Sequence, residues 1–223
     1  MSYIQTRRAD VGQLLSGTFI ELGQVKRELG LYFGGFALLG LLAEFAPKLV
    51  FVTGWLVWLG GIVAYWVGNY FLYQVMLRNS GALQHDGVRV FQFFFMAMLI
   101  GIAVLFGANF LVIPGVLLGA KWVMAPSYLV ARDRNLLNAM GDAWSASDGN
   151  TMSLSAAFVI LFLIWIAAFT LLNGVGEAIQ GGIGVSVLGS LGFHILPILL
   201  MGLSVTAYKQ LNEEADSYVD VFA

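Results

Sequence analysis

The chain has 223 residues, of which 59% are hydrophobic and 11% charged, whereas a soluble domain has roughly 45–50% apolar and about 25% charged residues. A soluble fold of this length cannot bury so much apolar surface, so lipid must solvate much of it. The formal net charge of −2 argues against a nucleic-acid binder. The absence of cysteine excludes disulfides, thiolate metal sites and cysteine nucleophiles.

Residues 10–28 have the pattern of an amphipathic helix, and Asp10 is placed to cap its first turn. Apolar side chains recur on one face at Val11, Leu14, Leu15, Thr18, Phe19, Leu22 and Val25. Two placements of this helix suit its apolar face equally. The helix either lies in the membrane interface or packs against the cytoplasmic side of the protein itself.

Six apolar runs then follow, and a helix needs about 20 apolar residues to cross a bilayer. We predict spans at about 29–45, 49–77, 90–113, 114–131, 152–172 and 185–209. The first two are expected to meet at a turn of Ala46-Pro47-Lys48, and the third and fourth at a tight hairpin that breaks at Pro114-Gly115. The predicted fold is therefore an all-α polytopic membrane bundle that forms one integral membrane domain over residues 1–223.

Three polar or glycine-rich segments complete the predicted layout. Residues 132–148 are polar but carry an apolar stripe at helical spacing, which predicts a second interfacial helix. The glycine-rich stretch 173–184 leads to the sixth span. The wider region 174–192 has the composition of a flexible outer loop, a re-entrant element or a gate, and we favour a flexible outer loop that runs into a glycine-rich helix. Residues 210–223 form an acidic tail.

Basic residues are distributed unevenly between the two sides of this layout. With six spans, nine Lys and Arg residues fall on the side of the two termini: Arg7, Arg8, Lys26, Arg27, Arg78, Arg89, Arg132, Arg134 and Lys209. Lys48 lies on the opposite side and Lys121 within a span. Because cytoplasmic loops carry the excess of Lys and Arg, both termini are predicted to be cytoplasmic. A model that merges the third and fourth runs would scatter these charges.

Residues 113–150 contain a block of motifs shared with a known family. The block comprises Ile113-Pro114-Gly115, Lys121-Trp122, Ala125-Pro126, the stretch from Asn135 to Met140, and Ala143-Trp144-Ser145. It resembles the bacterial six-helix inner-membrane proteins related to the membrane domain of glycerophosphoryl diester phosphodiesterases. The resemblance implies a membrane architecture in the bacterial inner membrane. It does not imply hydrolase activity, because the sequence carries no counterpart of the catalytic domain.

Lys121 is the first candidate for a functional residue, because an ionisable group within a span is costly. Counted from Pro114, it lies roughly 10 Å into the bilayer. One interpretation is a cation that faces a cavity and binds an anionic headgroup or a carboxylate. The other, which we favour, is a structural ion pair, with Glu44 or Glu177 as the partner, or a contact with a carbonyl.

His194 is the second candidate, three residues before Pro197 in the sixth span. It suits a proton relay, or a hydrogen bond to a neighbouring helix near a proline kink. Two distant histidines without cysteine do not predict a metal site, and no cofactor is predicted. The spacings Gly30–Gly34 and Gly115–Gly119 suit a close approach of helices.

No catalytic motif or paired-carboxylate arrangement is evident, so we expect a non-enzymatic protein. The predicted function is binding of membrane lipids or other membrane proteins, with a role in envelope organisation. A homo-oligomer is an open alternative for the protein partner, and no nucleic acid is expected. The competing hypothesis is a small transporter or channel for an anionic or amphiphilic solute, with Lys121, His194 and Glu177 along its path.

Overall fold

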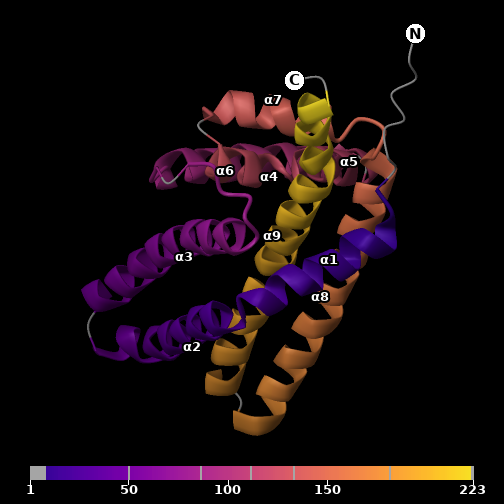
Figure 1. The fold of residues 1–223 in the computed structure, drawn as a ribbon. Helices are drawn as coiled ribbons and strands as arrows, with labels where there is room; N and C mark the ends of the chain where they lie inside the picture. Colours follow the sequence, from indigo (N-terminus) through magenta and orange to yellow (C-terminus); the bar gives the residue numbers. More distant parts are fainter. Residues whose placement is uncertain are drawn as a thin grey trace.

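The computed structural model (Figure 1) describes residues 9–49, 51–85, 87–110, 112–132, 134–180 and 182–221, without the side chains of 43–49, 51–53, 110, 180, 183 and 213–221. The described part contains nine helices and no strand. They are α1 (Val11–Gln24), α2 (Lys26–Leu49), α3 (Phe51–Asn79), α4 (Val90–Phe110), α5 (Val112–Trp122), α6 (Ala125–Ala131), α7 (Leu136–Ala146), α8 (Thr151–Gln180) and α9 (Gly182–Val221). The predicted all-α class is confirmed.

Six of these helices form three hairpins, α2–α3, α4–α5 and α8–α9, which point in different directions (Figure 1). Five helical stretches are long and apolar enough to cross a membrane: 54–79, 90–109, 112–131, 151–179 and 184–212. The first predicted span, 29–45, lies in α2, and its last side chains fall outside the described residues. Six spans therefore remain a prediction.

The hydrophobic core lies at one end of the hairpins. Fully buried side chains come from the end of α3, from α6, from the start of α8 and from the second half of α9, as Leu77, Leu129, Leu154 and Leu203 illustrate. The opposite halves of the hairpins expose large apolar side chains. These halves have the apolar surface expected of helices that face lipid.

The segments that carry most of the basic residues meet at the core end. The α3–α4 connection reaches α6 through a hydrogen bond from the Gln84 amide to the Ala131 carbonyl, at 2.9 Å. The guanidinium of Arg132 donates to the hydroxyl of Tyr208 at 3.1 Å, which joins the end of α6 to α9. The basic segments that the sequence assigned to one side thus lie close together.

Helix α1 crosses α9 and α8 in a contact lined by small residues (Figure 1). Asp10 caps it as predicted, because its carboxylate accepts from the Gln13 amide at 3.1 Å. A Cβ on Gly202 would lie 2.9 Å from the Thr18 side chain, so glycine permits the crossing. The other side of α1 exposes Phe19 and Ile20. Helix α1 therefore packs against its own protein, as one of the two predicted placements requires. It also keeps an exposed apolar surface, which the membrane-interface placement would use.

The expected outer loop at 173–184 is wrong. Helix α8 continues to Gln180, and α9 begins at Gly182. A Cβ on Gly176 would lie 2.7 Å from the carbonyl oxygen of Gly184, and a Cβ on Gly184 would likewise strike the Gly176 backbone. These glycines allow two helix backbones to touch and do not make a loop flexible. In contrast, no atom lies within 4 Å of a Cβ built on Gly30 or Gly34, so the close approach predicted there is not found.

The breaks around the third and fourth spans differ in position from the prediction. Helix α4 ends at Phe110 and α5 begins at Val112, so Pro114 lies within the first turn of α5, where proline is tolerated. Gly115 packs against Ala108, and a Cβ on Gly115 would lie 2.8 Å from the Ala108 amide nitrogen.

The expected turn at 46–48, between the first and second predicted spans, is part of α2, which runs to Leu49.

The predicted fourth span is not one continuous helix. Helix α5 ends at Trp122, and α6 begins after a turn at Val123–Met124 with Pro126 in its first turn. The predicted second amphipathic segment contains α7, whose N-cap Asn135 accepts from the Asn138 amide at 2.9 Å. The acidic tail begins inside α9, which remains helical to Val221.

Candidate functional site

The described part contains an apolar cavity of about 560 Å³, within the range of roughly 300–1,000 Å³ that is typical of ligand pockets. Helices α3, α4, α5, α8 and α9 and the Val123–Pro126 segment line it. Among the described residues, its wall contains no Lys, Arg, Asp, Glu or His side chain. Trp66, Phe93, Trp122, Phe158 and Phe162 are among its aromatic residues. Such a wall suits an uncharged, apolar ligand.

The cavity has a closed end and an open end. Its closed end reaches the buried core, where Tyr73 and Phe93 are only 6% and 3% exposed. At the other end, Leu105 and Val112 are 64% and 71% exposed. These two residues lie near the tip of the α4–α5 hairpin. The cavity therefore opens on the same surface that exposes the apolar outer halves of the helices.

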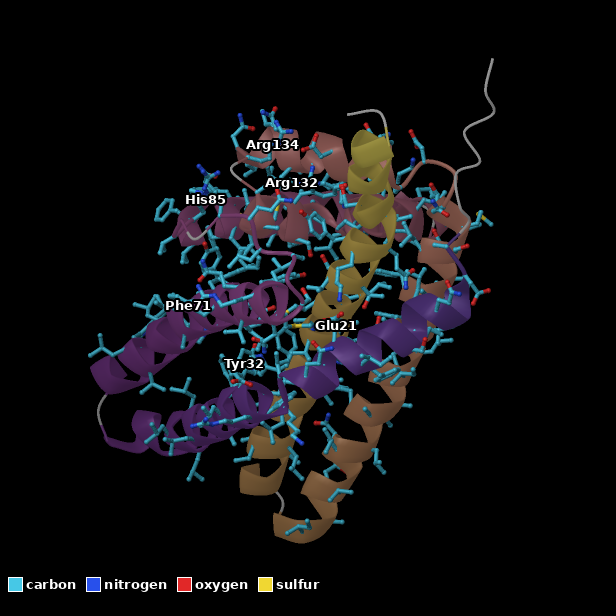
Figure 2. The ribbon with its side chains drawn as sticks, in the orientation of Figure 1. Glu21, Tyr32, Phe71, His85, Arg132 and Arg134 are labelled. Carbon is cyan, nitrogen blue, oxygen red and sulfur yellow. The ribbon has the colours of Figure 1, made fainter. Side chains whose placement is uncertain are left out.

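Tyr65 and Asn69 bring polar atoms to the α3 wall of the cavity. The Asn69 amide donates to the Tyr32 hydroxyl at 3.0 Å and to the Tyr65 carbonyl at 2.7 Å. The Tyr32 oxygen lies 3.2 Å from Nδ1 of His194. Figure 2 shows Tyr32 among side chains where α2, α3 and α9 meet. This network links all three helices behind the cavity wall.

His194 belongs to that network and does not line the cavity. Its side chain is buried, and its ring centroid lies 3.9 Å from that of Phe36 and 5.4 Å from that of Tyr65. The structure thus gives His194 the hydrogen bond to a neighbouring helix that one of the two sequence interpretations described. No second titratable side chain contacts it within the described residues except the tyrosines Tyr32 and Tyr65.

Lys121 pairs with Asp148 and not with either of the expected carboxylates. Its ammonium also lies 5.0 Å from the ring centroid of Trp144, and Trp144 packs against Trp122 with centroids 5.5 Å apart. The expected depth of Lys121 assumed a continuous helix. Because α5 ends at Trp122, Lys121 lies in its last turn, beside the α7–α8 connection that carries Asp148.

The two expected partners of Lys121 are elsewhere. Glu177 is exposed near the far end of α8, and the side chain of Glu44 lies outside the described residues. Within the described residues, no hydrogen bond or ion pair joins any two of Lys121, His194 and Glu177, and none of them lines the cavity. Within the described residues, no group of three His, Asp or Glu side chains is placed to hold a metal ion.

The cavity itself is what reasoning from sequence missed. Tyr65, Trp66 and Gly101 carry no local signal that distinguishes them from other residues of an apolar span. They acquire a role because three hairpins bring them together. The chain matches no protein-family model, no curated protein and no solved structure, so the resemblance to the phosphodiesterase membrane domain stays a prediction.

Proposed function

We propose that this chain is a non-enzymatic integral membrane protein that binds the hydrocarbon chain of a membrane lipid in the cavity and so serves the organisation of the bacterial envelope. The observation that carries the proposal is the cavity of about 560 Å³, free of charged side chains and open beside exposed apolar residues. An empty cavity leaves its wall without dispersion contacts on one side. A lipid chain from the surrounding bilayer restores them.

The favourable free energy of binding comes from van der Waals packing and not from the transfer of apolar surface out of water, because the lipid chain moves from surroundings that are as apolar as the cavity wall. Rigid aromatic rings and small residues shape a cavity that a flexible chain can fill. Gly101 contributes open space, since no atom lies within 4 Å of a Cβ built there. Binding should therefore depend on free volume at Gly101 more than on any charge.

The proposed orientation is in the inner membrane with both termini cytoplasmic. It is supported by the basic segments that gather at the core end, where the Arg89 guanidinium also donates to the Arg134 carbonyl. At the same end, α1 exposes Phe19 and α7 exposes Leu137 and Trp144. Apolar and tryptophan side chains beside basic groups suit a membrane interface.

The transporter alternative receives less support. A path for an anionic solute needs cationic or polar groups along a cavity. Lys121 is instead paired with Asp148, and His194 lies behind the cavity wall. We therefore favour binding of an uncharged chain over transport of an anion.

The test fills the cavity with one side chain. Gly101→Phe places a ring in the open space of the cavity, whereas Gly174→Phe adds the same ring at an exposed position of α8 with no neighbour within 4 Å. Each variant and the wild type are purified in detergent, and the lipid retained per mole of protein is measured by mass spectrometry. We expect the wild type and Gly174→Phe to retain lipid and Gly101→Phe to lose it. Equal retention by all three proteins would overturn it.

A further inference from the structure

We infer that the lipid which fits this cavity is an isoprenoid quinone, with its ring carbonyl accepting a hydrogen bond from Tyr65 and its tail leaving toward Val112. This inference rests on the proposed lipid-binding function and specifies its ligand. Four observations support it: the depth of the polar group, its missing partner, the shape of the cavity and the absence of charge.

The first observation is the depth of Tyr65 along its helix. Tyr65 is the middle residue of α3, 14 residues from Phe51 and 14 from Asn79, or about 21 Å from each end at 1.5 Å per residue. The polar headgroups of a bilayer begin about 15 Å from its midplane. Where α3 crosses the bilayer as one of the proposed spans, the esters and phosphates of an ordinary phospholipid lie beyond Tyr65. A ligand that hydrogen-bonds there carries its polar oxygen inside the hydrocarbon region, as a quinone does.

The second observation is that the Tyr65 hydroxyl is a hydrogen-bond donor of the cavity wall without a partner among the described residues, as are the indole N–H groups of Trp66 and Trp122. Both amide hydrogens of Asn69 are engaged, one with the Tyr32 hydroxyl and one with the Tyr65 carbonyl. Within the described residues, the Tyr65 hydroxyl itself has no hydrogen-bond partner. Its ring is held between Trp66 and His194, at centroid distances of 5.1 and 5.4 Å. A tyrosine hydroxyl in apolar surroundings usually finds a partner, and a carbonyl oxygen in the cavity would supply it.

The third observation is the change of lining along the cavity. The closed part is aromatic, with Trp66, Phe93 and Phe158, and aromatic rings pack well against a planar ring. The cavity then follows α4 from Phe93 to Ala108, a rise of about 22 Å, toward the open end. A flat head at the closed part and a long hydrocarbon tail at the open end match this arrangement.

The fourth observation is the lack of charge in the wall. An ionised headgroup placed here would remain unpaired in a medium of low dielectric constant, at high cost. A head bound inside this cavity must then be neutral, which excludes phosphate and carboxylate heads there and is met by a quinone.

The experiment compares two small probes with the same decyl chain on a planar six-membered ring, decylbenzoquinone, which has ring carbonyls, and decylbenzene, which has none; Tyr65→Phe then separates the hydrogen bond from differences in ring packing. The protein is purified in detergent and delipidated, and binding of the quinone is followed by quenching of tryptophan fluorescence, because Trp66 and Trp122 line the cavity. Decylbenzene is measured by its ability to displace the quinone. We expect saturable quinone binding about fivefold tighter than that of decylbenzene, the effect of one net hydrogen bond.

Tyr65→Phe removes only the hydroxyl and leaves the ring in place. It should weaken quinone binding about fivefold and leave the affinity for decylbenzene unchanged. If both probes bind wild type equally and Tyr65→Phe changes neither, the quinone inference is wrong while chain binding stands. If neither probe binds saturably, and a lipid retained by wild type is also retained by Gly101→Phe, the proposed function fails as well. Should Tyr65→Phe not fold, the comparison of the two probes on wild type still decides the inference.

Discussion

The ammonium of Lys209 lies 2.7 Å from a carboxylate oxygen of Glu21, and this ion pair joins α9 to α1 across 188 residues of sequence. The Glu21 side chain is only 7% exposed, and Figure 2 shows it on α1 where that helix crosses α9. Its second carboxylate oxygen is buried without a hydrogen-bond partner among the described residues. Lys209 is therefore the main compensation for this buried charge.

Lys209→Met should destabilise the protein by about 3 kcal/mol, because it leaves the Glu21 carboxylate buried without a cation. The double variant Glu21→Gln/Lys209→Met should regain most of that loss. The free energy of unfolding in mixed detergent micelles measures both effects. Lys121→Met is the control, since its partner Asp148 has a side chain 67% exposed, and ion pairs with a solvated partner contribute under about 1 kcal/mol. A loss for Lys209→Met no larger than for Lys121→Met would show that the buried pair does not hold α1.

Lys121→Met should lower the free energy of unfolding by only about 1 kcal/mol, the sum of one exposed ion pair and one cation–π contact. Its partner Asp148 has a side chain 67% exposed and remains solvated when the lysine is lost. Retained lipid should not change, because Lys121 does not line the cavity. Asp148→Asn is the matched control for the ion pair. If Lys121→Met lost its lipid at unchanged stability, a headgroup site at Lys121 would replace the structural role.

Gly176→Ala and Gly174→Ala should have opposite effects on stability, although both lie near the end of α8. A methyl group on Gly176 would strike the Gly184 carbonyl oxygen at 2.7 Å, whereas one on Gly174 meets no atom within 4 Å. Gly176→Ala should cost about 1–3 kcal/mol through overpacking, while Gly174→Ala should gain up to about 1 kcal/mol in helix propensity. Thermal unfolding of the two variants beside the wild type measures the difference. Equal effects would mean that α8 and α9 do not approach closely here.

This glycine pair also shows why part of the fold was predictable and part was not. Apolar periodicity is local, so the helices of the spans, the Asp10 cap and the short break near Pro114 followed from the sequence. A glycine-rich sequence occurs both in loops and where two helices approach closely, so the amino-acid composition does not distinguish the two. What distinguishes Gly176 is its partner Gly184, and the bend that brings them together is not visible in the composition.

The candidate site depends even more on tertiary structure. Lys121 was singled out by a depth counted along one helix, but that helix ends at Trp122, so both its depth and its partner differ. The cavity needs α3, α4, α5, α8 and α9 together. No local pattern marks Tyr65 or Gly101, because each becomes a lining residue only when hairpins distant in sequence meet.

The number of spans can be tested with single cysteines, because the chain contains none of its own. Gly23, Ser145 and Gly182 are exposed positions in α1, α7 and the start of α9. If all six spans cross, Gly23→Cys and Ser145→Cys lie on the cytoplasmic side, and Gly182→Cys lies on the outer side. A membrane-impermeant maleimide should then label only Gly182→Cys on spheroplasts, and the other two only on inverted vesicles. Denatured samples of each variant control for the reactivity of the thiol. Labelling of Gly23→Cys together with Gly182→Cys on spheroplasts would mean that α2 does not cross, which leaves five spans and places the amino-terminal helix outside, against the positive-inside distribution.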